Sequence, residues 1–526
     1  MHRYIFRELF KVFVPTAIAL TLILSLGIVL RPMQEYGVGP RQVVSLMGYF
    51  LPVTLTFVLP IAALFAGALA YGRLANDNEI DACKASGISL ATLIYPGLAL
   101  AIAIAIANLL LSFHVTPAFV HRAEESFKAD ARQILFRNVQ RRGYYKPPGS
   151  KTLIYADHAD MHNNLLAGVV AIETRDGTIG RINTAETAKV LFDLSEERNE
   201  VQITAYNTYQ MVSDDDLWFH IPFISLRPEF GPLMRDDIRF KRINDMKEIQ
   251  ADLMRFGPVA TLARQLYAQF TAELVAQDIA AGIAHDANES YELLGEPNSV
   301  RFTARRSYMQ EDGSVELTGG VVLAEYDTKS KRHLRTLRGA EATLYIEGNE
   351  FPPVMTIDIY NAQDRDTGDL VMRHIVHGLI PPKKIADKPR TGSILEDIRP
   401  QAISSALASG PGSKLSSLQN ALQRAIHLTL VQIKAEIHSR LVFGVGCVPM
   451  ILIGIGLGVI KRGGHLLSAF AASCVPAAVL IVCLMSGYEM TRNVSAKAVS
   501  GVAVMWAGFA LLSVLVVVIY HRLLRR

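Results

Sequence analysis

One short stretch of the sequence carries residue types that can bind a metal ion. In "DHADMH", His158, Asp160 and His162 stand at alternate positions. On a β-strand, alternate side chains share one face, so the three could coordinate one cation. Polar side chains on the water-facing side of a strand are far commoner than metal ligands. We therefore expect an ordinary exposed strand here, with no metal and no cofactor held by this chain.

The sequence lacks the motifs of the common catalytic and nucleotide-binding sites. It contains no G-x-x-x-x-G-K-[ST], so a P-loop for ATP is not expected. The motifs G-x-S-x-G, H-E-x-x-H and a paired C-x-x-C are absent as well. The net charge of +4 gives no reason to expect nucleic acid as a partner. No catalytic residue is therefore predicted.

The composition predicts a membrane protein with a large water-exposed part. Of the 526 residues, 50% are hydrophobic and 19% are charged, and the mean hydropathy is +0.24. The four cysteines lie in or beside apolar segments, so no disulfide framework is expected in the polar middle; they are Cys83, Cys447, Cys474 and Cys483.

Six runs without Asp, Glu, Lys or Arg are long enough to cross a bilayer as helices. Three stand at each end of the chain, at 12–30, 42–72, 85–121, 441–460, 463–488 and 498–521. The third exceeds the length of a span, so we expect its end near His114 to Pro117 to leave the membrane. Lys and Arg collect in cytoplasmic loops, and here they flank alternate spans: Arg3, Arg7, Lys11, Arg73, Lys84, Lys461, Arg462, Arg522, Arg525 and Arg526. Both termini and the loop after the second span are therefore predicted to be cytoplasmic, and the polar middle to lie outside the inner membrane.

The loop "YGRLANDNEIDACKASGIS" (71–89) between the second and third spans has the residues of a capped short helix. Asn76 is a possible N-cap, and Glu79 stands three residues later, as in a capping box. Gly87 stands where a left-handed C-terminal cap would fall. A loop that only connects two spans needs no such helix, so we predict a helix of about ten residues that contacts a partner.

In the polar middle, apolar and polar residues alternate as they do in β-strands, and the region contains a possible duplication. Strands are predicted at 152–156, 168–173, 188–194 and 200–212, then a helix over 245–284 that breaks near Gly257-Pro258, then a second β-block. Four segments recur at offsets of 152 to 155 residues: "GVVAIETRDG" and "GVVLAEYDTK", "TAETAKVLF" and "GAEATLYIE", "ITAYN" and "TIDIYN", "DLWFH" and "DLVMRH". Either the block is duplicated, or two β-segments of similar composition look alike.

The predicted organisation has six parts. They are spans 1–3 with a cytoplasmic helix at 76–87 (1–121), a first β-block (122–244), a helical connector (245–299), a second β-block (300–390), a linker and helix (391–440), and spans 4–6 (441–526). The predicted fold class is an α-helical membrane protein with six transmembrane helices (3 + 3) and a large, apparently duplicated periplasmic region of the β-jellyroll type.

Three ordered segments resemble the lipopolysaccharide-export permease family LptF/LptG, also called YjgP/YjgQ. They are "RYIFREL" (3–9), "LPIAALFAGALAYGRLANDNEIDACKASGIS" (59–89) and "AEIHSRLVFGVGCVPMILIGIGLGV" (435–459), the last with an E-x-H-x-R motif. The middle of this chain is longer than the single β-jellyroll usual in the family.

The resemblance implies an inner-membrane permease subunit that extracts lipopolysaccharide and works with four kinds of partner. These are a cytoplasmic ABC ATPase dimer that binds the ATP, a second LptF/LptG-type subunit, a periplasmic jellyroll bridge protein and the lipid itself. The loop helix would be the coupling helix that docks on the ATPase, through Asn76, Asp77, Glu79, Ile80, Ala82 and Gly87. Arg31 matches a basic position that meets lipid phosphates, and it could equally be a snorkelling interfacial arginine.

Two alternatives remain open on the sequence. The chain could be a permease for another envelope lipid or a lipoprotein, or a membrane-anchored scaffold whose β-domains bind periplasmic partners. The apolar runs contain almost no ionisable residue, which argues against an intramembrane enzyme.

Overall fold

A computed structural model describes most of the chain. The described residues are 1–36, 40–129, 131–146, 152–175, 178–194, 199–212, 218–226, 237–285, 290–310, 313–347, 353–382, 385, 394–407, 412–460, 466–492 and 498–525. They form two compact units, the first of residues 1–246 with 431–526 and the second of residues 247–430.

Six helices of the described residues are long and apolar enough to cross a membrane, and each contains most of one predicted span. In the first unit the helices are α1 (His2–Tyr36), α2 (Pro40–Asn76), α3 (Glu79–Ala85), α4 (Leu90–Leu110), α5 (Thr116–Ala129), α6 (Ala131–Arg142), α13 (Leu466–Arg492) and α14 (Ala498–Arg525). Helix α12 (Ser413–Ile460) supplies the fourth span. A π-helical turn (Leu111–Val115) joins α4 to α5 without ending the helix, at the place where the third apolar run is predicted to leave the membrane.

Small residues allow α12 to pack closely on α2. A Cβ added at Gly454 would lie 2.8 Å from the carbonyl oxygen of Leu64, and one at Gly458 would lie 2.6 Å from that of Ala68. Glycines four residues apart permit such close approach of two helices. The "GIGLG" segment is therefore used for packing within this chain.

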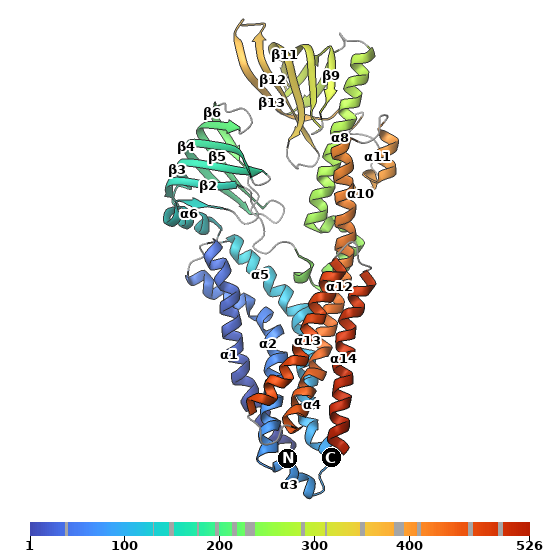
Figure 1. Ribbon diagram of the computed structural model, residues 1–526. Helices are drawn as coiled ribbons and strands as arrows, with labels where there is room; N and C mark the ends of the chain where they lie inside the picture. The colour runs from blue at the N-terminus through green and yellow to red at the C-terminus, as the bar shows by residue number, and fades with distance from the viewer. Residues whose placement is uncertain are drawn as a thin grey trace. The chain divides into compact units, whose positions relative to one another are not determined.

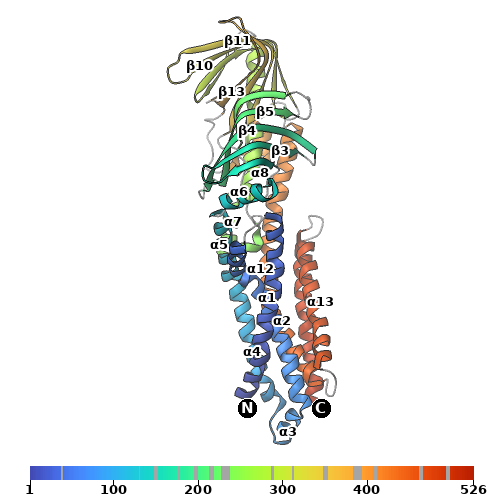
Figure 2. The same cartoon turned by 90° about the vertical axis from the view of Figure 1, so that its left-hand side faces the viewer.

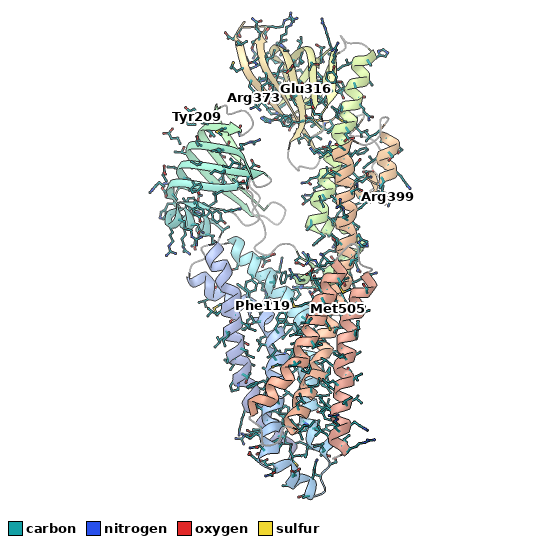
Figure 3. All side chains as sticks on the ribbon, viewed as in Figure 1. Phe119, Tyr209, Glu316, Arg373, Arg399 and Met505 are labelled. Carbon is teal, nitrogen blue, oxygen red and sulfur yellow. The ribbon has the colours of Figure 1, made fainter. Side chains whose placement is uncertain are left out.

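The first β-block is a six-stranded antiparallel sheet in chain order. Its strands are β1 (Tyr144–Tyr145), β2 (Thr152–Asp160), β3 (Leu165–Arg175), β4 (Thr178–Leu194), β5 (Asn199–Val212) and β6 (Trp218–Leu226). One face packs on Leu135 of α6 and on Phe50 near the start of α2. The other face carries Tyr155, which is 39% exposed, and Tyr209, which is 49% exposed; Figure 3 labels Tyr209.

In Figure 1, α3 and both chain termini lie at the same end of the helical bundle of the first unit. The β-sheet contacts the beginning of α2, whereas α3 follows the end of α2 directly. A helix of 37 residues extends about 55 Å. Helix α2 therefore separates the sheet from α3 by more than the thickness of a hydrocarbon core; Figure 2 shows the same order from the side.

The helices and 3₁₀ turns that lead from the first β-sheet into the second unit, and those within the second unit, are short except for α8 and α12. They are a 3₁₀ turn η2 (Ile238–Phe240), α7 (Ile243–Ala251), a 3₁₀ turn η3 (Leu253–Arg255), α8 (Gly257–His285), α10 (Ile394–Asp397) and α11 (Pro400–Ala406). The break between α7 and α8 confirms the predicted interruption near Gly257-Pro258.

The second β-block is a closed barrel. Its strands are β7 (Tyr291–Gly295), β8 (Asn298–Thr303), β9 (Arg306–Met309), β10 (Val315–Asp327), β11 (His333–Glu347), β12 (Val354–Asp364) and β13 (Leu370–Ile380). The ring β10-β11-β12-β13-β7-β8 closes through the β8–β10 pair, and β9 adds to β10. Leu323, Leu344 and Ile357 fill the interior.

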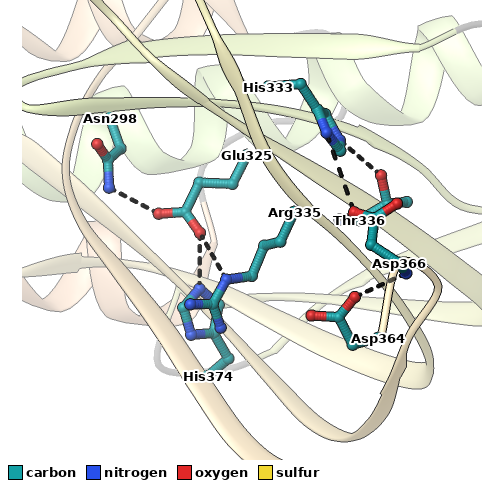
Figure 4. A network of polar contacts seen from close by, with 8 residues as sticks. All are labelled: Asn298, Glu325, His333, Arg335, Thr336, Asp364, Asp366 and His374. Carbon is teal, nitrogen blue, oxygen red and sulfur yellow. Dashed lines mark hydrogen bonds and ion pairs between the residues drawn. The ribbon is translucent and has the colours of Figure 1, made fainter. Parts of the chain in front are cut away.

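One end of the barrel interior is polar. The Glu325 carboxylate on β10 accepts a hydrogen bond from the Asn298 amide at 2.7 Å and lies 3.0 Å from the His374 ring. Arg335 is 3.7 Å away, and the four residues come from four strands (Figure 4). The two acceptor oxygens of Glu325 thus link strands that are distant in the sequence.

The two β-blocks share a four-strand meander, as the duplication predicts. Strands β3 to β6 and β10 to β13 follow one another in the same order. Ala188 pairs with Ala205 in the first block and Ala342 with Ile359 in the second, a shift of 154 residues for both partners. Asn207 and Asn361, also 154 apart, both have a positive φ, of 54° and 46°. Shared register and shared backbone irregularity support duplication over chance resemblance.

Several predicted limits of the β-region are wrong. Residues 122–129 and 131–142 are helical, so the described strands begin at Tyr144, and the second block begins with β7 at Tyr291, before 300. The amphipathic spacing of α6 was not recognised, and β7 is too short for alternation to reveal. The first described sheet is a meander and the second is a closed barrel, so the jellyroll assignment is not confirmed.

Candidate functional site

The loop between the second and third spans does contain a short helix. Helix α2 continues to Asn76, Asp77 and Asn78 form a turn, and α3 runs from Glu79 to Ala85. Asn78 has φ = 58°, a left-handed conformation that Asn tolerates better than most residues. The turn is fixed by hydrogen bonds from the Asp77 amide to the Arg73 carbonyl and from the Ala82 amide to the Asn78 carbonyl.

The predicted capping box is wrong. Asn76 is the last residue of α2, the N-cap of α3 is Asn78, and the Asn78 side chain makes no capping hydrogen bond. Glu79 is the first helical residue and not the third. The second span is longer than its apolar run, so the helix start moves by two residues and α3 has seven residues.

The predicted C-terminal cap at Gly87 is confirmed. Gly87 has φ = 80°, its amide donates to the Lys84 carbonyl, and the Ile88 amide donates to the Cys83 carbonyl. This pair of bonds is a Schellman motif. Ser89 then caps α4 by accepting from the Thr92 amide at 3.2 Å, so the chain reverses within four residues.

Ile80 anchors α3 in the bundle, while the opposite side of the helix faces outward. The Ile80 side chain is 4% exposed within the core of the helical bundle, whereas Asn76, Asp77, Ala82 and Gly87 are exposed. Glu79 is partly exposed. Five of the six predicted contact residues are thus accessible to a partner, and Ile80 positions them.

Residues of α1, which the sequence analysis missed, complete this site. The Tyr4 hydroxyl donates to Oε1 of Glu79 at 3.3 Å, and Glu8 forms an ion pair of 2.5 Å with Arg73. Met1, Tyr4, Ile5 and Glu8 have the i, i+3, i+4, i+7 spacing of one helix face. That spacing could have indicated a packed face on α1 before its apolar run begins.

The bundle holds α2 and α4 firmly around α3. Tyr71, 1% exposed, donates from α2 to the Leu93 carbonyl of α4 at 2.9 Å. Gly97 leaves room for this contact, because an added Cβ would lie 3.0 Å from the Tyr71 hydroxyl. The two helices on either side of α3 are therefore tied together just above it.

The E-x-H-x-R motif ties α12 to two other segments. Arg440 binds the Glu436 carboxylate at 2.8 Å, the carbonyl of Ser112 in the π-helical turn at 3.0 Å and the carbonyl of Arg239 at 2.8 Å. A π-helical turn frees carbonyl groups from their usual partners, and the guanidinium satisfies one of them. Trp506 donates to His438 at 3.3 Å.

Two other predicted positions belong to other parts of the chain. The backbone of Arg31 lies in α1, and its side chain lies outside what the structure describes. Asp160 builds the turn after β2 by accepting from the His162 amide at 2.9 Å and the Asn163 side chain at 2.8 Å. The Asn163 side chain and these backbone amides hold the pKa of Asp160 below its usual value. His162 follows the end of β2, so the three polar residues do not share one strand face.

Comparison with known proteins addresses the N-terminal half of the chain. Residues 3–244 match the family described as lipopolysaccharide export system permease LptF/LptG. The matched part contains α1 to α6 and the first β-sheet, and therefore the whole α1–α3 site. No curated protein matches the chain. Over residues 3–244, the chain is similar to the LptF/LptG permease family.

Proposed function

We propose that this chain is a permease subunit that extracts lipopolysaccharide from the bacterial inner membrane for export to the outer membrane. ATP hydrolysis takes place on a separate cytoplasmic ABC ATPase dimer, and α3 is the coupling helix that docks on it. A second LptF/LptG-type subunit completes the membrane part, and a periplasmic jellyroll bridge protein receives the lipid.

The observation that carries the proposal is the position of α3 at the opposite end of α2 from the first β-sheet. If α2 spans the bilayer, the sheet and α3 lie on opposite sides. Arg73 precedes α3 and Lys84 lies in its last turn. Both chain termini, near which the sequence carries Arg3, Arg7, Arg522 and Arg525, lie at the same end of the first unit (Figure 1). Basic residues collect on the cytoplasmic side, so α3 is cytoplasmic and the sheet periplasmic.

The shape of α3 suits docking on a rigid partner. Its N-terminal turn and its Schellman motif fix both ends, and Ile80 fixes its rotation. Glu79 presents a carboxylate that can pair with a basic or hydrogen-bonding group. Asn76, Asp77, Ala82 and Gly87 surround this carboxylate as neutral or acidic surface.

The exposed tyrosines of the first β-sheet are the surface on which lipid leaves the membrane part. Tyr155 and Tyr209 lie in one cross-strand row with Val170 and Thr184. Such a row offers an apolar surface with polar hydroxyl tips, suited to an amphipathic lipid. Arg31, at the outer part of α1, is proposed to meet lipid phosphates.

Copurification in a mild detergent tests the proposal. The tagged chain is expected to bring down an ABC ATPase, a second LptF/LptG-type subunit and lipopolysaccharide, identified by mass spectrometry. A Glu79→Gln, Asp77→Asn variant should lose the ATPase and keep the second subunit. Recovery of periplasmic proteins without any ATPase would instead favour a membrane-anchored scaffold. Recovery of a different bound lipid would indicate that the permease transports that lipid and not lipopolysaccharide.

A further inference from the structure

One side of the first two turns of α1 faces the region around α3. Met1, Tyr4, Ile5 and Glu8 recur at helical spacing; Ile5 and Glu8 are buried, at 3% and 4% exposed, and Met1 and Tyr4 are 50% and 47% exposed. Arg3 and Arg7 lie on the other side and are exposed. Ile5 and Glu8 are thus buried at the start of α1, although only 22% of the most apolar 18-residue stretch of this helix is buried within the protein.

The Glu8 carboxylate holds the chain immediately before the turn. It lies 2.5 Å from Arg73 in the last turn of α2 and 3.2 Å from Lys11 of its own helix. The carbonyl of Arg73 in turn accepts the Asp77 amide, two residues before α3. A buried carboxylate needs such charged partners, because burial without them is costly. Movement of Arg73 is therefore opposed by the burial of Glu8.

Tyr4 and Met1 hold the chain immediately after the turn. The Tyr4 hydroxyl donates to Glu79 at 3.3 Å, and Sγ of Cys83 lies 3.9 Å from Sδ of Met1. Together with Ile80 and Leu93, these residues line a space of about 20 Å³, enough for about one water molecule. Tyr4 and Met1 thus lie close to α3, with no large space between the two helices.

We propose that Tyr4 and Glu8 are positioning residues that fix α3 to α1, so that α1 is the first transmembrane helix to follow a displacement of the coupling helix. Helix α1 contacts the chain on both sides of the Asp77-Asn78 turn: Glu8 pairs with Arg73 before the turn, and Tyr4 donates to Glu79 after it. The bond from Tyr4 also selects which carboxylate oxygen of Glu79 remains for a partner. This inference rests on the proposed function of α3 as the contact for the ATPase.

The test measures amide hydrogen exchange of residues 79–88 in the full chain in lipid nanodiscs, which requires no ATPase. Tyr4→Phe removes the hydroxyl and Glu8→Gln removes the charge. Hydrogen bonds to charged groups are worth enough that exchange in α3 should become about tenfold faster in each variant. Arg7→Gln, a charge change of the same size and opposite sign at an exposed neighbour of Glu8, should leave the exchange of α3 unchanged.

A charge exchange distinguishes positioning from general destabilisation. Glu8→Arg with Arg73→Glu restores the ion pair in reverse and should bring α3 exchange back toward the wild-type rate, whereas Glu8→Arg alone should not. Unchanged exchange in both Tyr4→Phe and Glu8→Gln, or failure of the exchanged pair to restore protection, would overturn the inference. Failure of the wild-type chain to bind an ATPase would count against the proposed function instead, and the exchange measurement would still decide the contact between α1 and α3.

Discussion

Glu79 joins two roles in one carboxylate. It is the first residue of α3, it accepts a hydrogen bond from Tyr4 through Oε1, and it remains partly exposed. A cap that only stabilised the helix would not need the charge. Since the Asn78 side chain makes no capping bond, the order of this helix depends on Ile80, the Schellman motif and α1.

Glu79→Gln separates the charge from the fold. The glutamine side-chain oxygen can still accept from Tyr4, so the variant should remain folded and inserted. Loss of a charge partner at an interface costs about 2–5 kcal/mol, so binding of the ATPase should weaken by at least about tenfold. Glu125→Gln makes the same chemical change on α5, where the carboxylate is exposed beside His121, and should bind the ATPase normally. Equal ATPase binding in the two variants would contradict a coupling role for Glu79.

The polar end of the second barrel predicts a dependence on pH. Burial alone would raise the pKa of Glu325, but hydrogen bonds from His374 and Asn298 and the charge of Arg335 outweigh it, and the pKa lies below its usual value. A depressed carboxyl pKa contributes stability above the pKa of the unfolded chain, about 4.3, and this stability is lost as the pH falls through the folded-state value.

Amide exchange of residues 316–326, corrected for its intrinsic pH dependence, should therefore accelerate below about pH 4. In Glu325→Gln the same strand should be less protected at pH 7, by about 1.5–3 kcal/mol for lost hydrogen bonds to a charged group, and should respond little to acid. An equally steep acid response in Glu325→Gln would show that the stability comes from other groups.

At the scale of elements, periodicity predicted what is long and regular. All six apolar runs are helices, the strands at 152–156, 168–173, 188–194 and 200–212 lie within β2 to β5, and the duplication agrees in order and register. The predicted start of α3 is wrong because α2 continues as a polar helical turn beyond its apolar run, and hydropathy does not show where that turn ends. The contacts of Tyr4 and Glu8 depend on residues about 70 positions away, which local patterns do not encode.

Close packing of α12 on α2 makes Gly458 sensitive to size. An added methyl group would meet the Ala68 carbonyl at 2.6 Å and the Gly72 amide at 3.0 Å, both backbone atoms that cannot move aside. Overpacking of this kind costs about 1–3 kcal/mol. Gly458→Ala should therefore lower the thermal stability of the protein in detergent. Gly27→Ala, with no atom within 4 Å of the added group, should leave it unchanged or slightly higher, and equal melting temperatures would refute the close contact.

At the scale of the molecule, α2 places α3 and the first β-sheet at opposite ends of one long helix. Hydropathy and basic residues were sufficient to predict this arrangement from the sequence, because the bilayer restricts spans to apolar helices. The closure of the second barrel could not be predicted, since it depends on the short strands β7 and β8, which carry too few residues for a pattern.

Cysteine labelling tests the orientation. In a chain without its native cysteines, Asn163→Cys in the exposed turn after β2 should react with an impermeant reagent added to spheroplasts. Ser86→Cys, exposed at the end of α3, should react only after the membrane is opened. Ser213, a second candidate for the outer label in the predicted periplasmic region, lies outside the described residues. The reverse labelling pattern would invert the proposed topology.

The most direct measurement is lipid release from proteoliposomes that contain this chain, its partner permease and the ATPase, loaded with lipopolysaccharide and supplied with the bridge protein. The account predicts ATP-dependent transfer of lipopolysaccharide to the bridge protein, with transfer lost and the assembled membrane subunits retained when Glu79 is replaced by Gln. Transfer that proceeds equally well without ATP, or at the wild-type rate in Glu79→Gln, would contradict the claim that α3 couples hydrolysis to lipid export.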